Sequence, residues 1–418
     1  MSPRAPHTSP EVVSLEVDGL RILFRPNRAH EVVAARLYLV GGSSCTPLAQ
    51  AGVEAMYART ARRGTRRFPK SQLNATLARL GADLGAVVSH DATVFNLRCL
   101  ARHLPEAWEV YADVVVDPLL ETDEIEVVRQ QMLLDIQQTL DSPDGALGEM
   151  ARRHCYAGHP YAADPHGSEE SVPALDAATL RAHTARCWSR AGALLVVAGD
   201  LEADAVARYA ASFARLPRGA ARPDFPPRLA FESGTLVSAP RELPTNYVLG
   251  EFVAPALRDA DHPAMLVALS VLRDRFFEEV RTKRNLSYAP SASLGHDAAN
   301  LGSVYVTAVD PETTVEVMRG EMRRLMNEPL DPKELADKVR TFVTRYWLQN
   351  ETNQAQAGFV AAYELFGGGW EKSREFVPRL ESLVPADVQR VAGQYLRAIQ
   401  WIYLGDPMRA APEVFTDP

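Results

Sequence analysis

The first regular pattern in the chain is an alternation of apolar and polar side chains over residues 14–26, SLEVDGLRILFRP. A period of two predicts β-strands, and the Asp-Gly pair at residues 18–19 accepts the positive φ angles of a tight hairpin turn. A further apolar strand is expected over residues 32–40, and the helical spacing of apolar residues over 51–63 predicts a helix after it. The chain therefore begins with antiparallel strands that lead into a helix.

Later segments mix helical and strand-like patterns without strict alternation. Apolar residues recur with helical spacing over residues 71–80, 104–116 and 123–140, whereas GALLVVAGD at residues 192–200 is a strand-sized apolar run. Such a mixture favours an α+β fold, in which antiparallel sheets are packed by helices, over a doubly wound parallel sheet.

The two halves of the chain echo each other. PLLETDEIEVVR ends at Arg129 and PLDPKELADKVR ends at Arg340, 211 residues later, while LLVVAGD and WIYLGD end at Asp200 and Asp406. Internal duplication explains both pairs with one event. The alternative is chance similarity between short acidic amphipathic helices.

Proline residues mark the boundary between the halves. The segment LPRGAARPDFPP at residues 216–227 contains four prolines and a glycine, which interrupt all periodicity. After it the strand-rich pattern starts again, and a long apolar-periodic helix is expected over residues 262–281. We therefore predict two homologous domains of α/β-roll type, at residues 1–215 and 233–418, joined by a linker at residues 216–232.

Composition narrows the classes of function. Of 418 residues, 46% are hydrophobic and 23% charged, as in globular proteins, and the net charge of −8 makes a nucleic-acid partner unexpected. No apolar stretch reaches the length of a membrane span, and no signal peptide is visible, so we expect a cytoplasmic location, or a periplasmic one if a leader has been removed. Scattered cysteines favour reduced thiols over disulfides or a zinc ribbon. They are Cys45, Cys99, Cys155 and Cys187.

The order of several longer motifs resembles one family. VGGSS and LAQAGVEAMYARTARRGT are followed by LGADLGAVVSHDATVFNLRCL, then DPLLETDEIEVVRQQMLLDIQQTLDSP, GHPYAADPHGSEESV and LLVVAGDL. In this fixed order they resemble the pitrilysin or insulinase-type metallopeptidases, which include the mitochondrial processing peptidase and its bacterial relatives. The resemblance covers nearly the whole chain, so it is more specific than any single motif.

In that family one helix carries H-x-x-E-H, in which two histidines bind zinc and the glutamate activates water. With the Gly-Thr pair after the helix as register, the resemblance implies that the histidine positions fall on Ala55 and Arg59 and the glutamate position on Ala58. The distal ligand position falls on Asp135, which we expect to be a remnant, solvated or paired with arginine. Methyl groups and a guanidinium cannot bind Zn²⁺. We therefore expect no metal or other cofactor in this chain.

The second half keeps another motif of the family. FFEEVRTKRNLSYAPSASLG resembles its arginine–tyrosine motif, with Arg281 and Tyr288 seven residues apart. The resemblance implies that both side chains reach the zinc site of the other half-molecule, where a guanidinium can bind substrate carbonyls and a phenol can donate to the oxyanion. The alternative is structural: Arg281 stabilises a helix C-terminus, and the ring of Tyr288 packs in the core.

Three further segments are weaker candidates for chemistry. The densest group of possible metal ligands is His154, Cys155, His159 and His166. Its spacing does not place the ligands on one helix face. Glu54, next to the first lost histidine position, is expected on the helix surface. FGGGW at residues 366–370 lacks the Lys-Ser/Thr of a phosphate loop and predicts a turn between helices.

Two functions remain open on the sequence. In the first, the chain is the zinc-less subunit of a heterodimeric peptidase: a partner with H-x-x-E-H brings zinc, and this chain brings Arg281, Tyr288 and half of the chamber for a peptide substrate. The second is a catalytically dead scaffold or peptide-binding protein, as are the related core subunits of the respiratory cytochrome complex. A pure scaffold has no reason to keep the arginine–tyrosine pair. A third hypothesis, an autonomous metalloenzyme with relocated ligands, is supported only by the histidine cluster.

Overall fold

The computed structural model describes residues 11–220 and 224–418, which form two compact units. Each unit is assembled from three stretches of chain. The first unit comprises residues up to 136, 163–225 and 349–362, and the second comprises 137–162, 226–348 and 363–418. Two segments lie outside the described residues: residues 1–10, at the N-terminus, and residues 221–223, in the expected linker.

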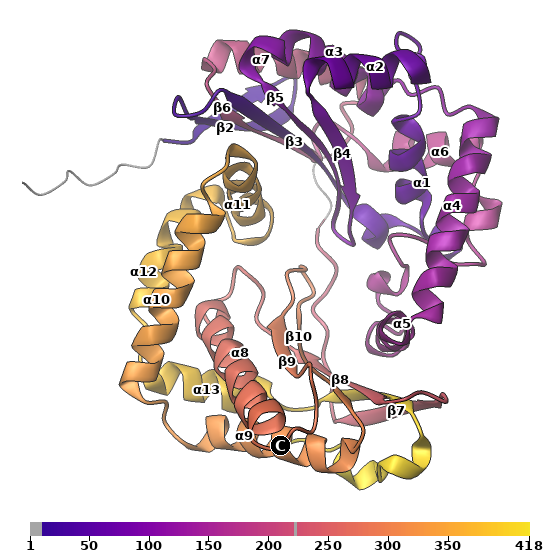
Figure 1. The fold of residues 1–418 in the computed structure, drawn as a ribbon. Coiled ribbons are helices and arrows are strands. Elements are labelled where there is room, and N and C mark those ends of the chain that lie inside the picture. The colour runs from indigo at the N-terminus through magenta and orange to yellow at the C-terminus, as the bar shows by residue number, and fades with distance from the viewer. Residues whose placement is uncertain (1–10, 221–223) are drawn as a thin grey trace, which may run out of the picture. The chain divides into compact units, whose positions relative to one another are not determined.

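A six-stranded sheet forms the centre of the first unit (Figure 1). Its order is β1-β2-β6-β3-β5-β4, in which β2 and β6 are parallel and all other neighbours are antiparallel. The strands are β1 Val13–Val17, β2 Leu20–Pro26, β3 Val32–Val40, β4 Asp83–Val88, β5 Ala92–Leu100 and β6 Ala193–Gly199. The predicted hairpin is confirmed, because Val17 pairs with Leu20 across a turn with φ angles of 49° at Asp18 and 83° at Gly19.

Amphipathic helices pack against this sheet. They are α1 Val53–Ala61, α2 Lys70–Leu80, α3 Leu104–Val116, α4 Thr122–Asp141, α6 Ala177–Cys187 and α7 Ala203–Ala210. Helix α3 is fixed to the sheet by the buried hydroxyl of Tyr111, which donates to the carbonyl of Phe95 at 2.9 Å and accepts from the N–H of Leu37 at 3.0 Å. Since these two groups belong to β5 and β3, a single side chain connects the helix with both strands.

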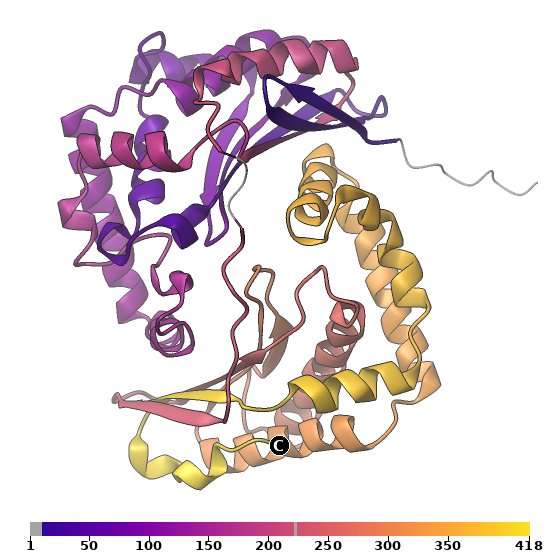
Figure 2. The ribbon, with the colours of Figure 1, turned by 180° about the vertical axis from the view of Figure 1, so that it is seen from behind.

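The second unit repeats this topology. Its strands are β7 Thr235–Pro240, β8 Asn246–Val253, β9 Ser291–Leu294, β10 Leu301–Ala308 and β11 Gln400–Gly405. The order β7-β11-β8-β10-β9 has one parallel pair, β7 with β11, seen in Figure 2 as rose and yellow arrows side by side. The other pairs are antiparallel. This is the order and pairing of β2-β6-β3-β5-β4, so the α+β class and the internal duplication are confirmed.

The helices of the second half are α8 His262–Phe276, α9 Pro311–Asn327, α10 Pro332–Gln349, α11 Asn353–Phe366, α12 Phe376–Glu381 and α13 Pro385–Tyr395. A π-helical turn at Phe277–Thr282 extends α8, so the helix predicted over residues 262–281 is confirmed. The glycines of FGGGW form a turn after α11, with φ angles of 83° at Gly368 and 121° at Gly369. That turn is also confirmed.

Each compact unit includes a helix from the other half of the sequence. Helix α5, Pro143–Cys155, packs against β8 and β11 of the second unit through Leu147, Ala151 and Cys155. The start of α11 belongs to the first unit, where the side-chain amide of Asn353 donates to the carbonyl of Val32 at 2.6 Å. Neither half of the sequence therefore supplies all the helices that pack on its own sheet.

Gly52 fixes the entry into α1. It has a φ of 84°, and a Cβ at this position would lie 2.7 Å from Cα of Gly167. A side chain is disfavoured both by the left-handed backbone and by this close contact. The loop that contains Gly167 is thereby held against the start of α1.

We expect Gly52→Ala to lower the free energy of unfolding of the first unit by about 1–3 kcal/mol, because a strained backbone and a steric contact add. Gly85→Ala in β4 is the matched control, since a Cβ there meets nothing within 4 Å. It should leave stability unchanged or raise it by less than about 1 kcal/mol. Thermal melting followed by circular dichroism measures both, and equal melting temperatures for the two variants would contradict the role of Gly52.

Candidate functional site

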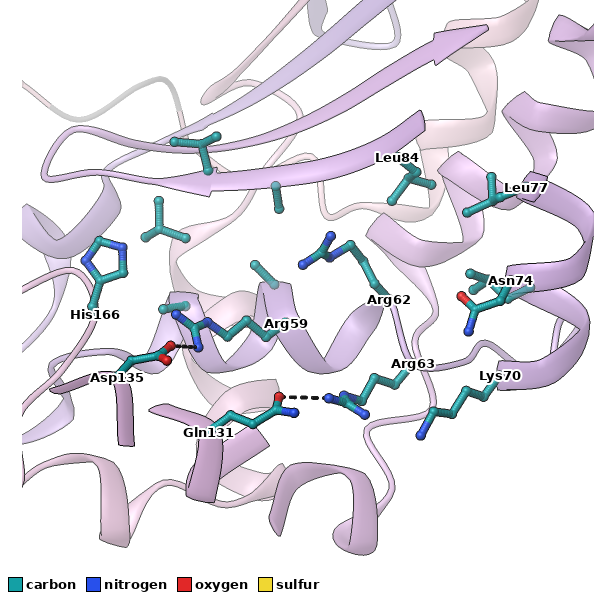
Figure 3. A pocket seen from close by; sticks show the side chains of 16 residues that line it. Arg59, Arg62, Arg63, Lys70, Asn74, Leu77, Leu84, Gln131, Asp135 and His166 are labelled. Atoms are coloured by element: carbon teal, nitrogen blue, oxygen red, sulfur yellow. Dashed lines mark hydrogen bonds and ion pairs between the residues drawn. The ribbon is translucent and has the colours of Figure 1, made fainter. Parts of the chain in front are cut away.

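Helix α1 carries the positions where the resembled family binds zinc. Ala55 and Ala58 are each 2% exposed and belong to the hydrophobic core of the first unit. Arg59 extends instead toward α4, where its Nη1 donates to Oδ2 of Asp135 at 2.6 Å (Figure 3). The two positions lie 76 residues apart in sequence. An ion pair between protein side chains thus joins α1 and α4 at two positions where the resemblance expects metal ligands.

The residues present do not fit a zinc ion. Ala55 and Ala58 offer no donor atom, and the guanidinium of Arg59 is a cation that presents only N–H groups. Across the part of the chain that the structure describes, no group of three or more His, Cys, Asp or Glu side chains is placed to hold a metal. Asp135 keeps a carboxylate in position and His166 lines the same pocket (Figure 3), but two such residues do not make up the three protein ligands of a catalytic zinc site.

The histidine cluster of the sequence has no common site. Nε2 of His154 lies 2.7 Å from Oγ1 of Thr235 and 3.0 Å from Oε1 of Gln400, and Nε2 of His159 donates to the carbonyl of Pro227 at 2.9 Å. His154 and His159 belong to the second unit, whereas His166 belongs to the first. His154 and His159 therefore have separate hydrogen-bonding neighbours, and Nδ1 of His166 lies 3.5 Å from Oδ1 of Asp164.

A pocket of about 790 Å³ lies beside the Arg59–Asp135 pair, between α1, α2, α4 and β4 (Figure 3). Its polar walls contain four cationic side chains. These are Arg59, Arg62, Arg63 and Lys70. Leucine, alanine and valine side chains form the apolar walls, at Leu73, Leu77, Leu84, Ala86, Val87 and Val88. The pocket therefore combines a cationic surface with an apolar one.

Two of these cations share a single carboxylate. Nη1 of Arg63 lies 3.0 Å from Oε2 of Glu124, and Nζ of Lys70 lies 2.6 Å from Oε1 of the same residue. The hydrogen bond from Lys70, together with that from Arg63, lowers the pKa of Glu124 below its ordinary value. Arg63 also donates to Oε1 of Gln131 at 2.8 Å. Since one negative charge faces two positive ones, a net positive charge remains on this wall.

Arg62 lies between these groups without a carboxylate of its own. Its Nε is buried and forms no hydrogen bond, and none of the described acidic side chains makes an ion pair with it. Burial, followed by repulsion from Arg59 and Arg63, lowers the pKa of Arg62. Figure 3 shows its guanidinium extending from the end of α1 toward β4. Leaving the buried Nε of a partly buried cation without an acceptor costs free energy, which an anion bound beside it would reduce.

Glu54 was expected on the helix surface, and that expectation is wrong. The residue is 2% exposed. Its Oε1 accepts from Nε2 of His183 at 2.8 Å and from Nε1 of Trp188 at 3.3 Å, and its Oε2 accepts from the hydroxyl of Thr93. The carboxylate is buried because these three donors satisfy it. These three donors lie in α6, in β5 and directly after α6. The sequence around Glu54 therefore could not predict them.

His183 connects this buried carboxylate with a cysteine. Its Nδ1 lies 3.9 Å from Sγ of Cys187, one turn further along α6. Burial alone would lower the pKa of His183, but the interactions with Cys187 and Glu54 raise it to about 9. Burial likewise raises the pKa of Cys187, yet His183 and Arg186 together bring it below its ordinary value. The result is a half-buried thiol whose pKa lies below its ordinary value.

Arg281 and Tyr288 lie together in the second unit. The guanidinium carbon of Arg281, in the π-helical turn, is 4.2 Å from the ring centroid of Tyr288 and 4.7 Å from that of Phe277. Tyr288 is 78% exposed, so its ring does not pack in the core. Stacking between two rings holds the planar guanidinium while leaving the N–H groups at its rim for an acceptor. Within the described ranges, no side chain forms an ion pair with Arg281.

Among the residues described, no helix combines the length and the apolar character needed to cross a bilayer.

Comparison with known families agrees with this architecture. Residues 21–164 match the family described as insulinase (peptidase family M16), and residues 174–342 match the family described as the peptidase M16 inactive domain. The chain belongs to the M16 peptidase family, which confirms the resemblance seen in the sequence. The first match covers strands β2 to β5 of the first sheet, and the second runs from α6 and β6 of the first unit into α10 of the second half.

Individual relatives differ in what their names say of activity. An uncharacterized zinc protease of Mycobacterium bovis is 31% identical over 259 residues, which are 57% of this chain and 57% of that protein, just over half of its length. The mitochondrial-processing peptidase subunit beta of Blastocladiella emersonii is 20% identical, covering 91% of this chain and 84% of that one. Subunit 1 of the bovine (Bos taurus) mitochondrial cytochrome b-c1 complex is 29% identical, covering 34% of this chain and 29% of that subunit.

A solved structure shows the same fold. The peptidase M16 inactive domain from Pseudomonas fluorescens superimposes with a TM-score of 0.89 at 20% sequence identity, covering 96% of this chain and 100% of that one. At this identity the similarity establishes the fold alone. Relatives in this family include subunits of larger complexes, as two of the names above state.

Alkylation should distinguish Cys187 from the other thiols. Burial raises the pKa of Cys45, Cys99 and Cys155, so at pH 7 Cys187 should react with iodoacetamide about tenfold faster than Cys45, the other half-buried cysteine. His183→Gln should slow this labelling and move its pH–rate profile to higher pH. Peptide mapping by mass spectrometry under native conditions measures both. An unchanged profile in the variant would show that His183 does not activate the thiol.

Proposed function

We propose that this chain is the zinc-less subunit of a two-chain M16 metallopeptidase. A catalytic subunit of the same family brings the H-x-x-E-H helix and zinc. This chain brings Arg281 and Tyr288 to the partner's active site and forms half of the chamber that encloses the peptide. Alone, it cleaves no peptide.

The observation that carries the proposal is the Arg59–Asp135 ion pair, at 2.6 Å, in the position of the metal site. It supports loss of zinc chemistry in a chain whose fold is otherwise complete. The description of the second matched family as inactive, and the names of relatives that are subunits, support the proposal as well.

The geometry of the second unit supports a contribution to catalysis. A ring that is 78% exposed adds little to the stability of the chain, and it costs solubility. A stacked arginine beside a free phenol is instead suited to bind a peptide carbonyl and to donate a hydrogen bond to an oxyanion. The peptide itself would pair with a sheet edge of the catalytic subunit through main-chain hydrogen bonds.

A scaffold or peptide-binding protein without any part in catalysis is the second candidate. The relative named as a subunit of the cytochrome b-c1 complex favours it, since that name describes membership of a complex and no peptidase activity. The two candidates differ in what they require of Arg281 and Tyr288, because only the peptidase subunit needs these side chains.

The zinc content of the chain tests the assignment of the metal positions. Purified alone, the protein should contain no stoichiometric zinc, whereas the triple variant A55H/R59H/D135E should bind about one equivalent, since two imidazoles and a carboxylate make a catalytic zinc site. Atomic absorption after dialysis measures both. Tightly bound zinc and peptide cleavage by the unaltered chain would refute the proposal.

Substitutions in the arginine–tyrosine pair test the contribution to catalysis. With the catalytic partner present, Arg281→Ala or Tyr288→Phe should lower kcat by about 10²-fold, the scale of losing one donor to an oxyanion. Arg284→Ala is the matched control, because this arginine lies three residues from Arg281 and pairs with Glu279. Peptide cleavage is followed by fluorescence. If all variants keep full turnover with an intact complex, the scaffold function is favoured.

A further inference from the structure

The pocket beside α1 has an excess of positive charge. Four cations line it, and the carboxylates that pair with them are Asp135 and Glu124, so two positive charges remain. The whole chain has a net charge of −8, which makes this local excess the opposite of the overall balance. A low-dielectric pocket concentrates such a field and attracts anions.

Arg62 is the cation of this pocket that has no carboxylate paired with it among the described residues. Its Nε is buried and has no hydrogen-bond partner among the described residues, although Asp83 and the cations Arg59 and Arg63 all act on its charge. A guanidinium offers a planar fork of donors that matches a carboxylate. Because Arg59 and Arg63, its neighbours, are also cations, the group that would accept hydrogen bonds from Arg62 must come from a ligand, and a carboxylate fits.

The opposite walls of the pocket favour a peptide over a small ion. Leu73 and Leu77 of α2 and Leu84, Ala86 and Val88 of β4 are apolar. In the described part of the chain, β4 ends the sheet and pairs only with β5, so the main-chain groups of its outer edge remain available. A volume of about 790 Å³ holds several amino-acid residues, far more than one inorganic anion.

We propose that this pocket binds an acidic peptide segment, with a carboxylate on Arg62 and apolar side chains against the leucines of α2 and β4. The site lies in the copy that lost the zinc motif, and the proposal requires neither a catalytic partner nor Arg281 and Tyr288. The proposal therefore gives the first unit a peptide ligand at the place where the resemblance expects a metal. Its failure would leave the proposed peptidase subunit untouched.

Binding of short labelled peptides to the full chain tests the proposal. The acetylated peptide Glu-Leu-Glu-Leu-Glu should bind at least about tenfold more tightly than Gln-Leu-Gln-Leu-Gln, the effect of one charge-assisted pair in a partly buried site. The lysine counterpart should not bind measurably. Fluorescence polarisation measures the affinities, and raising the salt concentration should lower the affinity for the acidic peptide.

Two variants with the same change in net charge locate the site. Arg62→Ala should lower the affinity for the acidic peptide about tenfold. Arg208→Ala, which removes an exposed arginine from α7 in the same unit, should leave that affinity unchanged. Arg62→Lys keeps the charge but loses the fork, so it should bind at an intermediate level. The melting temperature of Arg62→Ala should not fall, because the replacement removes a buried, unsatisfied donor.

Three outcomes would overturn the proposal. Equal affinity for the acidic and the glutamine peptide would show that charge does not direct binding. Equal losses in Arg62→Ala and Arg208→Ala would show that only the overall field acts. Inorganic phosphate that binds as tightly as the acidic peptide, and displaces it fully, would assign the pocket to a small anion.

Discussion

The sign of the charge at position 59 is the constraint on which the rest of the candidate site depends. The Arg59–Asp135 pair is half-exposed, so it contributes little to stability, about 1 kcal/mol at most. Its effect is chemical. A guanidinium at this point excludes a divalent cation, and it starts the series of cations that continues with Arg62, Arg63 and Lys70. Arg59 therefore gives this wall a cation where the resemblance expects a metal ligand, and Arg62, Arg63 and Lys70 add the positive charge that remains unpaired.

The positions where the resemblance expects metal ligands are part of the packed fold. Ala55 and Ala58 are core residues, and small side chains allow α1 to lie close to β4. The buried Glu54–His183 pair connects the same helix with α6 at 2.8 Å. Such a pair is costly to break once formed, because either partner alone would be an uncompensated buried group. Packing through Ala55 and Ala58 and the hydrogen bonds of Glu54 therefore keep the helix in place.

Local patterns were sufficient for the hairpin at Asp18-Gly19 and the α+β class, because turn residues and hydrophobic period act over short stretches. The duplication was predicted from motifs that recur after 211 residues. Motif order was sufficient for the family. The sequence could not place Glu54, since burial of a carboxylate depends on His183, Thr93 and Trp188, which are distant in sequence. It also could not show that Arg62 lacks a carboxylate, or that α5 packs on the second sheet. An amphipathic pattern predicts that one face of a helix is buried, but it does not identify the sheet against which that face packs.

The exchange of helices between the compact units has a consequence for the order of events during synthesis. The first sheet is complete by residue 199, but the unit around it also requires residues 349–362. At ribosomal rates of roughly 5–20 residues per second, that helix arrives many seconds after the last strand of the sheet. During this interval the nascent first unit lacks the hydrogen-bond partner that Asn353 of α11 later gives to the carbonyl of Val32 and to the side-chain amide of Asn27. A chain built in this way is most vulnerable to chaperone binding and proteolysis when it is more than half made.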